Sequence, residues 1–298
     1  EYDQVHAFIK NGDTPIALGT LASETSKEIS LGVNSLFASH IGIFGNTGSG
    51  KSYSLASLYH SLFKKFGEKD GFKKNAKFLL IDFNGEYSND NSIINDKKVY
   101  KLTTRKELKD ISDNEKLPLN ESVIFDLEVV SILSEATEKT QKPFIKRALE
   151  KYELTFNKDQ PEKYLIGILK SKFKSILQLK NKERAYELLD YFYNILSEIT
   201  PNFRDKLHDE LEWHDSKCGF KPKGNNDVFN LDNSNSIEGL VSYSLLDKYC
   251  LKLNKLELLI DFMYIQIIED VIVNRARNEH ISPAINKLKS KSKDLYKV

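Results

Sequence analysis

The spacing of hydrophobic residues divides the chain into a β-rich start, an alternating middle and a long helical remainder. Within residues 1–36, short apolar runs are separated by turn residues, which is typical of a small meander or a fragment of a barrel. The strands predicted in this part lie at residues 5–9, 16–18 and 29–33.

Residues 37–130 alternate between apolar runs and a helical pattern. Leu55, Leu58, Leu62 and Phe66 recur at helical spacing, so a helix is predicted over residues 53–65. Continuous apolar strands that alternate with helices indicate a parallel sheet covered on both faces. The strands predicted here lie at residues 40–44, 78–82, 99–102 and 123–126.

From about residue 131 the apolar spacing becomes helical. The helices predicted in this part lie at residues 165–177, 185–199 and 245–273. Residues 215–236 are rich in Lys, Asn, Gly, Ser and Asp and are predicted to form a loop. The basic stretch 287–297 is predicted to be a solvated face, with phosphate contact by its lysines as the alternative.

Residues 45–52 read GNTGSGKS and fit the pattern G-x-x-x-x-G-K-[ST] of a phosphate-binding P-loop. The glycines allow successive backbone N–H groups to turn toward an anion, and the positive end of the following helix points at the same place. Lys51 would reach the β and γ phosphates, and the Ser52 hydroxyl would ligate Mg²⁺. The alternative is a Gly/Ser-rich turn that imitates the motif. The predicted nucleotide-binding residues are Gly45, Asn46, Thr47, Gly48, Ser49, Gly50, Lys51, Ser52 and Tyr53.

A P-loop enzyme also requires carboxylates, one near Mg²⁺ and one that orients the attacking water. Asp82 ends an apolar run, and Glu86 follows within the sequence DFNGEY. We predict catalytic roles for Lys51, Asp82 and Glu86, with Asp82 also near the metal. Alternatively, Asp82 only caps the next turn and Glu86 is a surface residue. Asp126, with its neighbour Glu128, is the second candidate for the metal carboxylate.

The nucleotide is predicted to be ATP. Residues 82–85 fit the D-x-x-G element of GTPases, but residues 157–160 (NKDQ) lack the final acid of the guanine-binding N-K-x-D motif. A GTPase or small-molecule kinase remains an alternative. His208, His214 and Cys218 match no standard zinc-site spacing.

The overall charge of the chain is nearly balanced, because 44 basic residues face 43 acidic ones and leave a net charge of +1. Contact with DNA would therefore depend on local patches or on a pore formed by several subunits. Two cysteines do not make a disulfide framework, which favours a reducing, cytoplasmic location. No apolar run approaches the length of a membrane span.

Three stretches together resemble the HerA branch of the HerA/FtsK ATPases. They are residues 18–21 (LGTL), 40–52 (HIGIFGNTGSGKS) and 81–87 (IDFNGEY), and residues 134–141 follow the family more loosely. The family commonly has D-P-H-G-E-Y at the last of these, whereas this chain has Phe83 and Asn84 in place of Pro and His.

The resemblance implies an α/β fold with a RecA-like P-loop NTPase core at residues 37–130, a small β segment at 1–36 and a large helical insertion at 131–298. It implies a hexameric motor that moves double-stranded DNA with ATP and Mg²⁺, together with a nuclease or an anti-phage effector. An ATP-gated ring scaffold that organises an effector is an alternative function.

One departure from the family concerns its main acidic strand, which ends in Asp-Glu and is followed by an arginine finger. Residues 258–261 (LLID) resemble that strand only superficially, because they lie inside a helical pattern. We therefore expect the chain to be the N-terminal part of a longer protein, with that strand and the arginine finger beyond residue 298. Hydrolysis of ATP by this part alone would then be poor.

Overall fold

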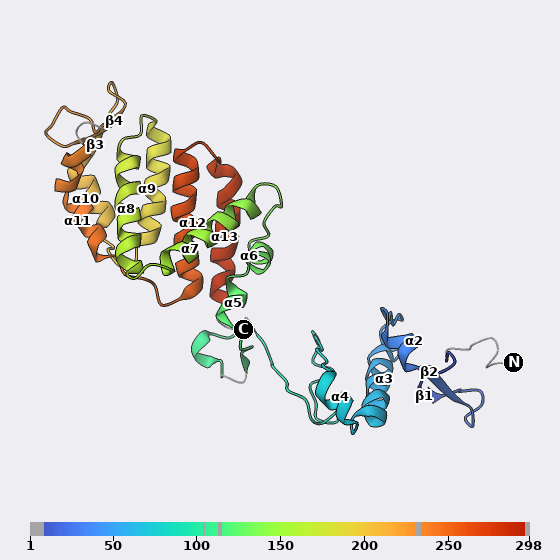
Figure 1. The fold of residues 1–298 in the computed structure, drawn as a ribbon. Helices are drawn as coiled ribbons and strands as arrows, with labels where there is room; N and C mark the ends of the chain where they lie inside the picture. Colours follow the sequence, from blue (N-terminus) through green and yellow to red (C-terminus); the bar gives the residue numbers. More distant parts are fainter. Residues whose placement is uncertain (1–8, 104, 113–114, 231–233, 296–298) are drawn as a thin grey trace. The chain divides into compact units, whose positions relative to one another are not determined.

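The computed structural model of the chain describes residues 9–103, 105–112, 115–230 and 234–295 (Figure 1). Two compact units make up the chain, Glu1–Val99 and Tyr100–Val298. The domain boundaries predicted from the sequence, after residues 36 and 130, stay predictions. Most of the strand predicted at residues 5–9 lies outside the described residues.

The first unit begins with a two-stranded antiparallel sheet. Strand β1 (Pro15–Thr20) pairs with β2 (Glu28–Gly32), with Pro15 opposite Gly32 and an irregularity between Ala17 and Gly19. These two strands confirm the predictions at residues 16–18 and 29–33. A short helix, α2 (Val33–Phe37), follows directly.

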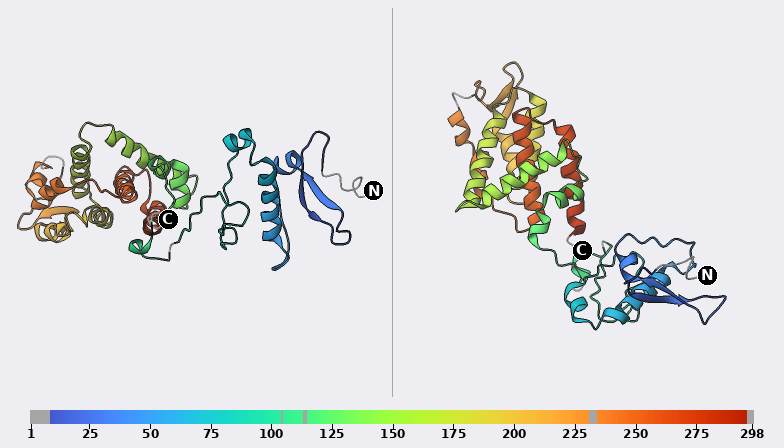
Figure 2. Two further views of the ribbon diagram at one scale, coloured as in Figure 1. Left: turned by 90° about the horizontal axis from the view of Figure 1, so that it is seen from below. Right: turned by 45° about the vertical axis from the view of Figure 1, so that its right-hand side comes forward.

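Helix α3 (Lys51–Phe66) packs against β1, as Figures 1 and 2 show, and confirms the helix predicted over residues 53–65. Ile16 of the strand and Leu58 and Leu62 of the helix form a small buried cluster. Helix α4 (Asp70–Asn75) adds aromatic packing, because the ring of Phe72 lies 6.1 Å from that of Phe63. The helix that begins at the predicted P-loop is therefore held in place by the hairpin.

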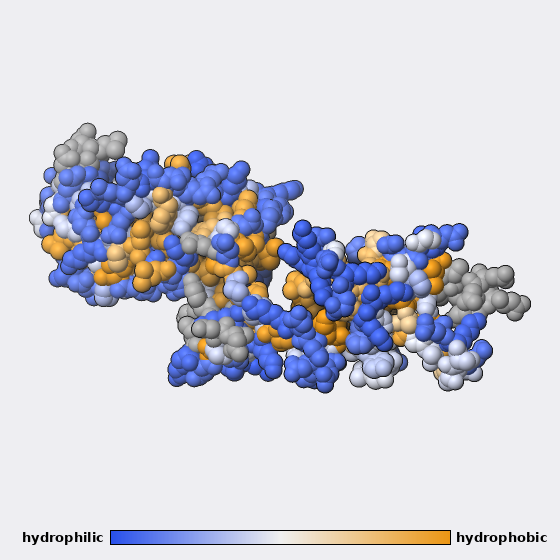
Figure 3. All heavy atoms as spheres, turned by 60° about the horizontal axis from the view of Figure 1, so that its bottom comes forward, coloured by the Kyte–Doolittle hydropathy of each residue, from blue (hydrophilic) through white to orange (hydrophobic). Residues whose placement is uncertain are grey.

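The parallel strands predicted at residues 40–44, 78–82 and 99–102 do not form within the described residues, where only the two short hairpins are strands. An extended segment becomes a strand only when a neighbour accepts and donates its backbone hydrogen bonds. The apolar side chains of these segments are instead highly exposed, with Phe44 at 94%, Leu79 at 88% and Ile81 at 73%. Hydrophobic residues accordingly reach the surface of this unit (Figure 3).

The strand predicted at residues 123–126 is wrong. Residues Glu121–Ile124 form the short helix α5, and Asp126 is the N-cap of α6 (Leu127–Leu133). The Asp126 Oδ1 atom accepts hydrogen bonds from the backbone N–H groups of Glu128 (2.9 Å) and Val129 (3.1 Å). A four-residue apolar run does not distinguish a strand from a helical turn, and the capping preference of Asp favours the helix here.

The second unit is a helical body. After a 3₁₀ turn, η1 (Leu108–Asp110), its long helices surround α12, which contacts α7, α8, α9 and α13 (Figures 1 and 2). Those helices are α7 (Gln141–Phe156), α8 (Pro161–Leu177), α9 (Lys182–Leu196), α12 (Lys255–Ile272) and α13 (Asn278–Leu295). The helices predicted at residues 165–177 and 185–199 are confirmed, with ends that differ by a few residues.

Two parts of this body differ from the prediction. The predicted loop at 215–236 contains strand β4 (Gly219–Pro222), which pairs with β3 (Leu211–His214). The helix predicted over 245–273 begins only at Lys255. Shorter elements precede it: α10 (Phe203–Glu210), η3 (Ser234–Gly239), α11 (Val241–Leu245) and η4 (Leu246–Lys248).

The lysines of α13 are largely paired rather than simply solvated. Lys287 and Lys291 both contact the carboxylate of Glu135, and the Lys289 ammonium donates to Asn194 Oδ1 at 2.9 Å. The two ammonium groups lower the pKa of Glu135 to about 2, chiefly through the hydrogen bond from Lys287. Within the described residues, no helix has the length and apolar character needed to cross a membrane.

Candidate nucleotide-binding site

The backbone of residues 45–50 adopts dihedral angles that depend on its glycines. Gly48 and Gly50 have positive φ angles of 81° and 88°, a region that other residues rarely adopt. A Cβ atom on Gly45 would lie only 2.3 Å from the Ser49 hydroxyl, so no larger residue fits there without a shift. The loop is therefore tightly turned, and every residue from Gly45 to Gly50 is exposed.

The N-terminus of α3 is open to an anion. Gly50 is the N-cap, no side chain caps the helix, and no acidic residue lies in its first turn. The first N–H groups of a helix have no partner within it, and the helix dipole places partial positive charge at this end. Ser52 is half-buried in the first turn, and Tyr53 is 80% exposed. The uncapped N–H groups and the absence of acidic side chains in the first turn of α3 are suited to binding a phosphate group.

Lys51 folds back over its own loop. Its ammonium donates a hydrogen bond to the backbone carbonyl of Asn46 at 2.8 Å. This contact joins the two ends of the loop that residues 46–51 form and holds the Lys51 ammonium beside the loop backbone. Among the predicted binding residues, Asn46 and Thr47 complete the exposed rim.

Asp82 organises the second motif. Its Oδ1 atom accepts from the N–H groups of Asn84 (3.2 Å) and Gly85 (2.9 Å), and its Oδ2 atom accepts from Tyr87 N–H at 2.8 Å. Desolvation raises the pKa of Asp82, but the backbone hydrogen bonds together lower it more, so its pKa lies below the ordinary value. Gly85, with a φ of 73°, makes the turn possible. In this structure Asp82 therefore caps the turn that follows it, as the alternative interpretation of this residue expected.

A hydrogen bond connects the two motifs. The Tyr87 hydroxyl donates to the backbone carbonyl of Ser52 at 3.3 Å, which ties the Asp82 turn to the first turn of α3. Glu86, between these contacts, is exposed. Tyr87 is the last residue of the DFNGEY motif, and its role in joining the two motifs was not predicted from the sequence.

The chemistry of these side chains suits ATP with Mg²⁺. Both oxygens of Asp82 already accept hydrogen bonds from backbone N–H groups of the turn, those of Asn84, Gly85 and Tyr87. The carboxylate oxygens of Asp82 and the hydroxyl oxygen of Ser52 are the kind of ligand that Mg²⁺ takes. The catalytic and metal-binding roles of Lys51, Ser52, Asp82 and Glu86 stay predictions.

The other candidate residues all belong to the second unit. Asp126 caps α6, and Glu128 pairs with Lys142 at 2.9 Å, both in the second unit. His214 Nδ1 accepts from Lys217 N–H at 3.3 Å, and the Cys218 thiol contacts the Asp215 carbonyl. Among the described residues, no group of three or more His, Cys, Asp or Glu side chains is arranged to hold a metal ion.

Comparison with known families gives one match. The family model described as "Helicase HerA, central domain" matches residues 16–237, which is more than half of the chain. No curated protein and no solved structure matches the chain. The matched range includes the P-loop, the Asp82 turn and the Tyr87 contact that connects them. This match indicates an ATPase of the HerA/FtsK type, and proteins of this family typically form oligomers and bind DNA. With most of its length matched in this way, the chain belongs to the family of the HerA helicase central domain.

Proposed function

We propose that this chain is the ATP-binding and ATP-hydrolysing part of a HerA-like translocase that moves double-stranded DNA. The observation that carries the proposal is the pairing of a glycine-shaped loop and uncapped helix with the Asp82 turn, held together through Tyr87 and Ser52. The match to the HerA helicase family supports the ATPase part of this proposal.

In this proposal the backbone N–H groups of residues 46–51 and the Lys51 ammonium hold the phosphates. Ser52 ligates Mg²⁺, and Asp82 or Glu86 supports the metal or the attacking water. A hexameric ring completes each site with groups from the neighbouring subunit, and a nuclease or an anti-phage effector works with the ring. The tendency of the family to form oligomers supports the ring.

Replacement of the P-loop lysine tests the proposal. In the full-length protein, we expect Lys51→Ala to raise the Kd for ATP by tenfold or more and to abolish turnover, because the phosphates lose a charged hydrogen-bond donor. Lys64→Ala is the matched control, since Lys64 is an exposed lysine on the same helix. Binding can be measured with a fluorescent ATP analogue and turnover by phosphate release. ATP binding and turnover equal to those of the control would contradict the P-loop assignment.

A second candidate function is an ATP-gated ring scaffold that organises an effector enzyme without processive movement. The net charge of +1 favours this alternative, since it provides no global attraction to DNA. A translocation assay on duplex DNA separates the two, because a scaffold that hydrolyses ATP would displace no triplex-forming or roadblock strand. A preference for guanine nucleotides, or a phosphorylated small-molecule product, would instead indicate a GTPase or kinase.

A further inference from the structure

An open cavity of about 390 Å³ lies in the helical unit, between the start of α7 and the segment that joins α12 to α13. Its lining is strongly basic. The residues that carry this character are Lys139, Arg147, Arg275 and Arg277, with Asn274 and His280 beside them. None of these residues belongs to the P-loop or the Asp82 turn.

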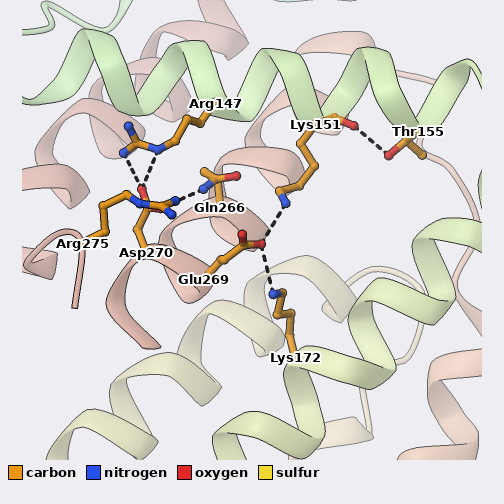
Figure 4. A network of polar contacts seen from close by, with 8 residues as sticks. All are labelled: Arg147, Lys151, Thr155, Lys172, Gln266, Glu269, Asp270 and Arg275. Atoms are coloured by element: carbon orange, nitrogen blue, oxygen red, sulfur yellow. Dashed lines mark hydrogen bonds and ion pairs between the residues drawn. The ribbon is translucent and has the colours of Figure 1, made fainter. Parts of the chain in front are cut away.

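Two of the arginines are fixed by one buried carboxylate. Asp270 is fully buried, and its Oδ2 atom accepts from both Nε (3.2 Å) and Nη2 (2.6 Å) of Arg147. Its Oδ1 atom accepts from Arg275 Nη1 at 2.9 Å and from Gln266 Nε2 at 2.9 Å (Figure 4). One guanidinium suffices to balance a carboxylate, so this cluster holds an extra positive charge in a rigid geometry.

The backbone brings Arg275 back over the end of α12. Asn274 has a positive φ of 58°, and the N–H groups of Arg275 and Ala276 both donate to the Asp270 carbonyl, at 2.7 and 3.3 Å. On the other side, the Gln141 amide donates to the His280 carbonyl at 2.8 Å, which ties the start of α7 to α13. The cavity walls are therefore connected by hydrogen bonds.

The charges around the cavity do not cancel. Within the described part of the chain, the carboxylates in contact with its lining are Asp270 and Glu279, and Glu279 lies 3.7 Å from Arg277. Four cationic side chains thus face two carboxylates. No ion pair of Lys139 is found among the described residues, and Arg277 is 81% exposed. Backbone N–H groups contribute little, because those of Gln141 and Lys142 already donate to the Thr137 carbonyl.

We propose that this cavity binds a phosphate group through Arg147, Arg275, Arg277 and Lys139. A guanidinium held by one edge keeps its remaining N–H donors directed outward, and this planar geometry matches phosphate oxygens. The phosphate can come from a DNA backbone or from a free nucleotide. All residues of the proposed site belong to the second unit, whereas the P-loop belongs to the first.

The test uses the double variant Lys139→Gln/Arg277→Gln, which leaves the buried Asp270 cluster intact. Lys206→Gln/Lys248→Gln is the control, because both lysines are exposed on the same unit and the change in net charge is the same. Every protein also carries Lys51→Ala, so that nucleotide binding by the P-loop is weakened to the same extent in the double variant and in the control. The probes are a fluorescein-labelled 20-base-pair duplex and a fluorescent ATP analogue.

We expect the double variant, but not the control, to bind one probe about tenfold more weakly at equal thermal stability. Weaker binding of the duplex identifies backbone phosphate as the ligand, with a salt dependence whose slope falls by roughly two. Weaker binding of the ATP analogue identifies a free nucleotide. Equal binding of both probes by the double variant and the control overturns the proposal, as does a parent protein that binds neither probe.

Discussion

Asp261 is a buried acid whose charge depends on pH. It lies on α12, only 1% exposed, with the Lys252 ammonium at 2.9 Å and the Tyr249 hydroxyl at 3.2 Å from its oxygens. Burial raises the pKa of Asp261 to about 7, against the opposing effects of Lys252 and Tyr249. The residue was predicted to lie inside a helix rather than at the end of an acidic strand, and α12 confirms this.

The raised pKa makes the stability of the helical unit depend on pH. Between the ordinary value of 3.8 and about 7, the folded state binds the proton of Asp261 more tightly than the unfolded chain does. The contribution of Asp261 to folding is therefore complete below pH 4 and is lost as the pH rises to 7. Its full size is of the order of 4 kcal/mol, since each pKa unit corresponds to about 1.4 kcal/mol.

We expect Asp261→Asn to remove this part of the pH dependence. The free energy of unfolding, measured in denaturant from pH 5 to pH 8, should fall less steeply in the variant than in the parent protein. Asp247→Asn is a suitable control, because Asp247 is an exposed acid paired with Lys170. Parallel pH profiles for the parent and Asp261→Asn would contradict the assignment of a raised pKa to this residue.

At the scale of elements, α12 is the centre of the helical unit. Nearly every residue from Leu256 to Val271 is buried, so the helix is apolar on all sides and is surrounded by its neighbours. The polar exceptions, such as Asp261 and Asp270, are paired with Lys or Arg side chains. Side chains on every face of α12 therefore pack into the core of the helical unit.

Truncation of one side chain on α12 should have a large effect on stability. Ile265 is completely buried, and we expect Ile265→Ala to lower the free energy of unfolding by about 2–5 kcal/mol through lost burial and a residual cavity. Ile132→Ala, at a position that is 72% exposed, should change it by less than about 1 kcal/mol. Chemical denaturation monitored by circular dichroism measures both, and similar losses would contradict a central role for α12.

The helices were easier to predict than the strands, for a physical reason. A helix such as α9 closes its hydrogen bonds within itself, so its apolar spacing alone identifies it. A parallel strand requires neighbours, and residues 78–82 show the apolar pattern without pairing in this structure. The β3–β4 hairpin was missed because each strand is only four residues long: Leu211–His214 alternates over just two apolar residues, and Gly219–Pro222 has one large apolar side chain. The tight turn of residues 45–50 was predictable because its glycines allow the positive φ angles that Gly48 and Gly50 adopt.

At the scale of the whole molecule, the two units differ in how much apolar surface they bury. The helical unit has an extensive core that runs from Val130 to Leu288, whereas the hydrophobic core of the first unit, among its described residues, is the small cluster of Ile16, Leu58 and Leu62. Segments with few buried contacts open with a low free energy. Backbone amides of α3 should therefore exchange their hydrogens faster than those of α12.

Binding of ATP with Mg²⁺ should reduce this difference. A ligand that binds the folded P-loop stabilises it by mass action, so exchange in residues 45–53 and 82–87 should slow while exchange in α12 is unchanged. Hydrogen exchange with mass spectrometry measures these segments separately. Lys51→Ala is the control and should show no protection. Protection confined to α12, or none in the parent protein, would contradict the proposed site.

The hydrogen bond from Lys51 to the Asn46 carbonyl has a consequence for ligand choice. Any ligand that recruits this ammonium must first displace an oxygen that the loop itself provides. A triphosphate has distal oxygens that could replace it, whereas a monophosphate has none. In the proposed function, we therefore expect the loop to favour nucleotides whose phosphate chain is long enough to supply an oxygen in place of the Asn46 carbonyl.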